Sequence, residues 1–134
     1  MGGEGRSEEV NASRTFGEFM KNKRIEKGLT LADVAMKVGC SRVFLCDVEN
    51  DRRKPPENEK LEMLMDALGL SASDRVECYD LAGNARDAVS QDLKGYIMDN
   101  EAVRMALRLA KDAGMTAGEW MEIADEIQKR KKNL

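Results

Sequence analysis

The chain has 134 residues, of which 35% are charged and only 4% aromatic, with two prolines and a formal net charge of −3. That length suits one well-buried domain or a small domain with a helical appendage, and the composition favours short amphipathic helices over a β-sandwich or barrel, so we expect an all-α protein. The net acidity argues against a protein that coats nucleic acid indiscriminately, since non-specific affinity grows with the number of phosphates neutralised, but it permits a local positive face.

The first predicted elements along the chain are an arm and a helix. Residues 1–14 hold three glycines and few apolar groups, so we expect a flexible arm that buries too little surface to become ordered. In the residues that follow, Phe16, Phe19 and Met20 fall at i, i+3 and i+4. This spacing predicts an amphipathic helix of about three turns, which ends at Gly28.

Two short helices joined by a turn are predicted next. Thr30 and Asp33 have the spacing of a capping box, with Asp in place of the usual Glu or Gln, and predict the start of a helix that ends at Gly39. Ser41 is the predicted N-cap of the following helix, which ends before the basic, proline-containing loop at residues 52–56. The residues predicted to face inward from this pair are Leu31, Val34, Ala35, Val38, Leu45 and Val48.

The remainder of the chain also has helical periodicity. A fourth helix follows Pro56 and ends at Gly69, and a fifth runs from Ser73 to Gly83. Three more helical pieces are predicted at residues 93–98, 103–113 and 117–131, the last opened by a capping box between Thr116 and Glu119. The chain therefore divides into an arm at residues 1–14, a five-helix domain at 15–83 and a helical extension at 84–134.

The segment GLTLADVAMKVGCSRVFLCDVENDRRKPP, residues 28–56, has the features of a helix-turn-helix centred on residues 30–50. Two helices that meet through a short turn need a small residue at their contact and a left-handed residue in the turn, which Ala35 and Gly39 supply. On this segment the chain resembles the Cro/C1-type helix-turn-helix regulators of the bacterial and phage Xre family. The resemblance covers residues 15–83 and implies a lambda-repressor-like fold that binds a double-stranded DNA operator.

The resemblance also implies which side chains meet DNA. The exposed face of the second helix enters the major groove in related domains, so Arg42, Val43 and Asp47 are expected to read guanine, a thymine methyl and cytosine N4, respectively. Phe44 lies at the boundary of this face, and both packing on the fold and contact with a thymine methyl remain open. Phosphate contacts are expected from Ser41, Lys37, Arg52, Arg53 and Lys54, with a solvated charge run as the alternative for the loop.

A second basic stretch precedes the motif, at residues 21–27, and is a candidate part of the positive face. Within it, the family pattern places Arg24 in a structural pair with Glu49 that joins the first helix to the end of the reading helix. Two residues depart from that pattern. Leu31 stands where many relatives carry a Gln that contacts DNA, which removes one expected polar contact, and Lys23 stands where an apolar core residue is usual.

The extension at residues 84–134 has two apolar stripes and no proline, and it is too short to hide both stripes internally. Because a single helix-turn-helix gains specificity by pairing half-sites about one helical turn apart, we expect a homodimer. Packing of a stripe onto the chain's own domain is the alternative. The basic residues 129–132 are expected to be a solvated helix end, with contact to DNA as the alternative. The expected dimer or partner contacts are Leu107, Trp120, Ile123 and Ile127.

Other classes of function find little support in the residues. The chain has no histidine, and Cys40, Cys46 and Cys78 include no C-x-x-C pair, so we expect reduced thiols, no metal site and no cofactor. Without an imidazole base for a cysteine nucleophile, and without clustered carboxylates, we expect no enzymatic activity. No apolar run approaches the roughly 18 residues of a membrane span, and the N-terminus lacks a signal-peptide core, so a cytoplasmic protein with no membrane partner is expected.

These observations lead to one main hypothesis and one alternative. The main hypothesis is a transcriptional regulator, more specifically a repressor, that binds an inverted-repeat operator as a dimer. The alternative is an antitoxin-like or peptidase-paired interaction protein of a mobile element, which binds a protein partner through the C-terminal helices and uses the helix-turn-helix for autoregulation.

Overall fold

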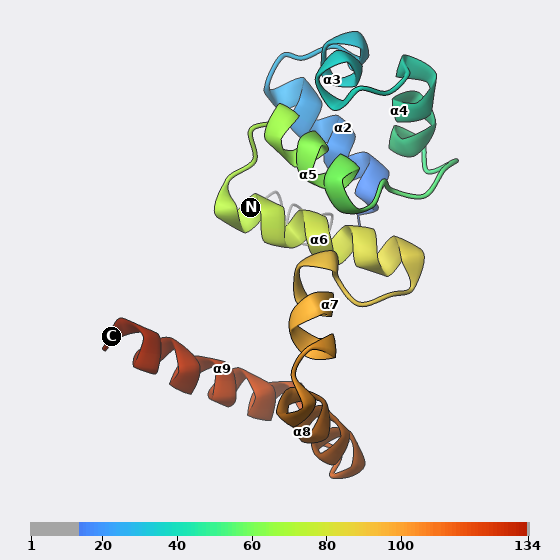
Figure 1. Cartoon of the computed structure of the whole chain (residues 1–134). Helices are drawn as coiled ribbons and strands as arrows, with labels where there is room; N and C mark the ends of the chain where they lie inside the picture. The colour runs from blue at the N-terminus through green and yellow to red at the C-terminus, as the bar shows by residue number, and fades with distance from the viewer. Residues whose placement is uncertain (1–13, 134) are drawn as a thin grey trace, which may run out of the picture. The chain divides into compact units, whose positions relative to one another are not determined.

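The computed structural model describes residues 14–133, and within that range it consists of eight α-helices and no strands (Figure 1). The all-α prediction is therefore confirmed. The chain divides into two compact units, Met1–Lys94 and Gly95–Leu134, called here the N-terminal and C-terminal units. The helices are α2 (Phe16–Glu26), α3 (Leu31–Val38), α4 (Arg42–Glu49), α5 (Asn58–Ala67), α6 (Ala72–Arg86), α7 (Gln91–Met98), α8 (Glu101–Asp112) and α9 (Ala117–Lys132).

The core of the N-terminal unit lies among α2 to α6, the five helices that the sequence predicts. Helix α2 packs on α4 and α6, while α3 packs on α4 and α5 (Figure 1). The inward faces supply one continuous apolar cluster, whose largest fully buried members are Phe19, Met20, Leu45, Leu61, Leu64, Met65 and Leu68. Burying each such side chain contributes about 1.5–3 kcal/mol to folding, so this cluster holds α4 in place through Leu45 and Val48.

The predicted helix starts are confirmed by their hydrogen bonds. Thr30 Oγ1 accepts from the Asp33 N–H at 3.0 Å while the Asp33 carboxylate accepts from the Thr30 N–H at 2.9 Å, which completes the capping box of α3. Ser41 Oγ accepts from the Phe44 N–H at 3.0 Å and caps α4. Between them Gly39 has φ +76°, a left-handed conformation that a residue with a Cβ rarely adopts. These caps fix the turn between α3 and α4.

A close approach between α2 and the end of α4 sets their relative position. A Cβ placed on Gly17 would lie 2.5 Å from the carbonyl oxygens of both Val48 and Glu49, so only glycine fits there. Asp51, at φ +58°, accepts hydrogen bonds from Thr15 Oγ1 at 2.7 Å and from the Gly17 N–H at 3.2 Å. Asp51, two residues beyond the end of α4, thus places a carboxylate at the N-terminus of α2, where negative charge is favourable.

Helix α6 differs from its prediction at both ends. Its N-cap is Ser71, whose Oγ accepts from the Asp74 N–H at 3.2 Å, and not Ser73. It continues past Gly83 to Arg86 and ends at Asp87, which has φ +54°. A glycine is needed at this helical position because the chain after α6 passes close to it. A Cβ on Gly83 would lie 2.8 Å from the Ala88 carbonyl oxygen. The glycine serves close packing and does not end the helix.

The N-terminal unit also extends beyond the predicted domain boundary at residue 83. Gln91, at the start of α7, accepts from the Asn58 N–H at 2.6 Å and donates to the Asn58 carbonyl oxygen at 3.1 Å, which ties α7 to the start of α5. The expected arm, residues 1–14, lies outside the described residues except for Arg14. The Arg14 guanidinium lies 2.7 Å from Glu77 Oε2 and 4.8 Å from the centre of the Phe19 ring, so this residue packs on the domain.

In the C-terminal unit the predicted helices are confirmed with small shifts at their ends. Thr116 and Glu119 form the predicted capping box at the start of α9. Within α7, α8 and α9 no described residue is buried. The apolar stripes of this unit are therefore left in contact with solvent in the single chain.

Candidate nucleic-acid interface

Helix α4 has one face in the core and one face in solvent. Leu45 and Val48 are fully buried, whereas Arg42 is exposed and Val43 is 69% exposed. A helix held by its inner face with its outer N-terminal half uncovered is the geometry with which such helices enter the DNA major groove. Two of the predicted base-reading residues, Arg42 and Val43, are on this outer face.

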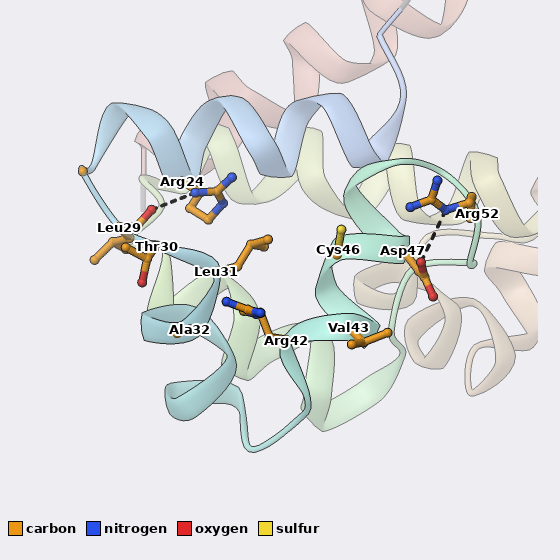
Figure 2. A pocket seen from close by; sticks show the side chains of 11 residues that line it. Arg24, Leu29, Thr30, Leu31, Ala32, Arg42, Val43, Cys46, Asp47 and Arg52 are labelled. Carbon is orange, nitrogen blue, oxygen red and sulfur yellow. Dashed lines mark hydrogen bonds and ion pairs between the residues drawn. The ribbon is translucent and has the colours of Figure 1, made fainter.

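An open groove of about 650 Å³ lies beside that face, between α4 and the connection from α2 to α3 (Figure 2). Of the predicted DNA contacts it brings together four, Arg42, Val43, Asp47 and Arg52. The side chain of Arg42 extends from the start of α4 toward Leu31, the first residue of α3 (Figure 2). The other lining residues are Arg24, Gly28, Leu29, Thr30, Leu31, Ala32 and Cys46.

Asp47 and Arg52 face each other at the other side of this groove. Arg52 Nε lies 3.4 Å from Asp47 Oδ1, and the two side chains are 65% and 33% exposed, respectively. In the unbound protein the carboxylate of Asp47 therefore already accepts from Arg52. A contact from Asp47 to cytosine N4 would have to share this acceptor, and the pair also holds Arg52 at the edge of the groove (Figure 2).

Phe44 lies apart from this groove. It is half-buried against the hydrophobic core, with the Arg53 guanidinium 5.1 Å and the Lys60 ammonium 5.5 Å from the centre of its ring. This placement agrees with the packing alternative for Phe44. The ring also acts as a platform that brings two cations together through cation–π attraction. Sequence reasoning missed Lys60, because a single lysine in the first turn of a helix has no distinguishing pattern.

The basic loop is exposed but anchored at its proline end. Arg52, Arg53 and Lys54 are exposed, whereas Pro55 and Pro56 are buried. The Arg86 guanidinium donates to the Pro55 carbonyl oxygen and forms an ion pair of 2.8 Å with Glu57. Lys37 is exposed in the last turn of α3, and Ser41 is exposed at the start of α4. The cations therefore project from a backbone that the rest of the unit holds in place.

Two lysines of the basic stretch at residues 21–27 are directed toward α6 and the turn before it. Lys23 Nζ lies 3.2 Å from Asp74 Oδ2, and Lys27 Nζ donates to the Gly69 carbonyl oxygen at 3.2 Å, so both contact α6 or the turn before it. The ion pair with Asp74 explains how a lysine is accommodated at position 23, where the family pattern has an apolar core residue. The positive charge beside α4 comes instead from the loop and from Lys60.

Arg24 and Glu49 form the ion pair that the family resemblance implies. Arg24 Nε and Nη2 donate to the two carboxylate oxygens of Glu49 at 2.6 and 3.1 Å, and Nη1 donates to the Leu29 carbonyl oxygen at 2.9 Å. The Glu49 side chain is 4% and the Arg24 side chain 14% exposed. The hydrogen bonds to Glu49 raise the pKa of Arg24, which stays charged. This pair joins α2 to Glu49, the last residue of α4.

The cysteines of the unit are buried or half-buried thiols. Burial raises the pKa of the Cys78 thiol to about 12, and burial likewise raises the pKa of Cys40. Cys46 is half-buried in the groove, and its carbonyl oxygen accepts from Asn50 Nδ2 at 2.9 Å. No group of three potential metal ligands occurs in residues 14–133. None of the helices described over the same range is long and apolar enough to cross a membrane.

Comparison with known family models identifies the domain to which these helices belong. Residues 15–77, just under half of the chain, match the family model of a helix-turn-helix domain. Among solved structures, a chain from the complex of the SinR and SinI proteins is similar at 21% sequence identity with a TM-score of 0.42, over 88% of this chain and 99% of that one. No curated protein matches.

Proposed function

We propose that the helix-turn-helix domain matched at residues 15–77 is of the Cro/C1 type, and that the protein is a cytoplasmic transcriptional repressor that binds an inverted-repeat operator as a dimer. The observation that carries the proposal is the outer face of α4. Its N-terminal half is exposed and capped at Ser41, its inner half is fixed in the core, and the basic loop projects beside it.

The contacts divide into base reading and phosphate binding. Arg42 and Val43 face the groove and are assigned to base edges, with Arg42 suited to guanine O6 and N7. Arg53 and Lys54 are assigned to phosphates, together with the backbone N–H groups at the start of α4. Phosphate contacts position a protein on the duplex without reading its sequence, whereas each good base contact discriminates by about 1–3 kcal/mol.

Selection from a pool of random duplexes at fixed salt tests this division. We expect the wild-type protein to enrich an inverted repeat. Arg42→Ala should relax preference at one base position by about 1–3 kcal/mol, while Arg53→Ala should weaken all duplexes alike and reduce the salt slope by about 1. Arg108→Ala, which removes the same charge from an exposed position in the C-terminal unit, is the matched control. Equal effects of all three substitutions would contradict the assignment.

Dimerisation is proposed to use the apolar stripes of the C-terminal unit. Leu107, Trp120, Ile123 and Ile127 are between 37% and 60% exposed in the single chain, and no residue of α8 or α9 is buried. Trp120, Ile123 and Ile127 follow one another at i, i+3 and i+7, so they share one side of α9. Amphipathic helices with no buried side chain gain their stability by covering such a stripe, and a second copy of the chain provides the same surface.

The oligomeric state is measured by sedimentation equilibrium of the full chain. We expect twice the mass of the chain, and a dissociation constant raised about tenfold or more by Ile123→Ala, as for a buried interface anchor. Asp125→Ala, on the opposite side of α9, should leave the dimer unchanged. A wild-type chain that stays monomeric at concentrations where it binds its operator would instead favour the alternative, in which these helices bind a different protein.

A further inference from the structure

The groove beside α4 has an apolar floor and a cationic rim. Leu31, Ala32, Val43 and Cys46 supply its apolar lining, the Arg42 side chain extends into it toward Leu31, and Arg52 lies at its edge, paired with Asp47 (Figure 2). A cationic rim fits a polyanion, but an apolar floor offers no hydrogen bonds to a phosphate. This combination suits a ligand whose outer part is anionic and whose inner part carries an apolar group.

Leu31 is held firmly as part of that floor. It is the first residue of α3, directly after the capped Thr30, and it is half-buried with one side packed against the hydrophobic core. Across the groove Val43, a β-branched residue with one strongly preferred rotamer in a helix, is 69% exposed. Both side chains therefore line the groove as preorganised apolar groups that the protein alone leaves uncovered, with the Arg42 side chain between them (Figure 2).

In the DNA major groove, the C5-methyl group of thymine is the apolar feature of the base edges. A donor or acceptor of a base edge placed against Leu31 and Val43 would lose water without gaining a partner, which is unfavourable. We infer that Leu31 is a specificity-determining residue, which together with Val43 receives a thymine C5-methyl in each half-site. This inference rests on the proposed function and adds to it the base chemistry that the groove selects.

The same chemistry has a consequence for modified DNA. A 5-methylcytosine carries its methyl group at the same ring position as thymine, so a cytosine at that place in the operator should bind better when it is methylated. Leu31, which in the family pattern replaces a polar residue, thereby changes the selectivity from hydrogen bonding to methyl recognition.

The experiment replaces each thymine of the selected operator by deoxyuridine, one position per half-site at a time, which removes only the methyl group. We expect the dissociation constant to rise about fourfold per half-site at the position that faces Leu31, the change that corresponds to one buried methyl group. At the same position, methylation of a substituted cytosine should lower the dissociation constant by a similar factor.

Protein variants identify the residues responsible. Val43→Ala and Leu31→Ala should bind the thymine and deoxyuridine operators nearly equally, and Val43 is exposed enough that its truncation leaves folding intact. Met36→Ala, on the same helix as Leu31 and 83% exposed but outside the groove, is the matched control and should retain the fourfold difference. A selected operator whose binding is indifferent to every deoxyuridine would overturn the inference while leaving the proposed function in place. Absence of any selected sequence would overturn both.

Discussion

Removing the Glu49 carboxylate is expected to destabilise the N-terminal unit strongly. Glu49 accepts two hydrogen bonds from Arg24, at 2.6 and 3.1 Å, and its side chain is 4% exposed. Glu49→Ala would leave a guanidinium that is 14% exposed with only the Leu29 carbonyl oxygen as a described partner. Breaking a buried pair from one side costs about 3–5 kcal/mol, a large part of the roughly 5–15 kcal/mol that stabilises a typical protein.

The free energy of unfolding is best measured by urea titration followed by far-ultraviolet circular dichroism. The single tryptophan, Trp120, lies in the C-terminal unit, so its fluorescence would not report on the Arg24–Glu49 pair. Asp47→Ala is the control, because it removes the ion pair between Asp47 on the same helix and Arg52. These side chains are 33% and 65% exposed, respectively, and such exposed pairs contribute about 0–1 kcal/mol to stability. If Glu49→Ala costs no more than Asp47→Ala, the structural role assigned to the pair is refuted.

Three further results are expected. Gly17→Ala should lower the free energy of unfolding by about 1–3 kcal/mol, as overpacking does, because its Cβ would lie 2.5 Å from two carbonyl oxygens, and an unchanged urea midpoint would contradict this. Burial and the hydrogen bond to Glu62 raise the pKa of Tyr79 to about 12, so its contribution to stability is present below its usual pKa of 10.0 and is lost as the pH rises toward 12. Phenolate absorbance should therefore show a late-ionising tyrosine that Tyr79→Phe abolishes and Tyr96→Phe retains. Cys78, buried and with its pKa raised to about 12, should react with a thiol reagent only after unfolding, whereas equal rates at all three cysteines would contradict its burial.

Local sequence signals predicted most of the helices, because their causes are short-range. The capping box at Thr30 and Asp33 and the glycine at residue 39 act within one turn of chain, and both have the predicted geometry. The apolar spacing of Phe16, Phe19 and Met20 likewise has the buried face it predicts. Such features can be read from sequence since neighbouring residues alone decide them.

The features that sequence missed depend on contacts between distant residues. Gly83 was interpreted as a helix end, but it is a packing position that the chain at Ala88 approaches. The basic stretch around Lys23 was assigned to a positive face, whereas its charges meet partners such as Asp74, 51 positions farther along the chain. Lys60 lies beside the basic loop only because the fold brings it, like Arg53, to the ring of Phe44. Composition and spacing carry no information on such pairings.

The candidate interface could be predicted only in part, because some of its features depend on neighbouring residues and others on contacts between distant ones. The positions of Arg42 and Val43 on the outer face of α4 followed from helical periodicity once Leu45 and Val48 were assigned to the core. The pairing of Asp47 with Arg52 was not foreseen, because it depends on how the chain turns after α4.

The most direct measurement of the central claim is selection of random duplexes by the wild-type protein, followed by a titration of the enriched sequence against a scrambled duplex at the same salt concentration. We expect an inverted repeat whose half-sites are separated by one helical turn, about 10–10.5 base pairs from centre to centre, bound at least 10³-fold more tightly than the scrambled duplex. Equal affinity for the enriched and scrambled duplexes would contradict the claim that this helix-turn-helix reads sequence.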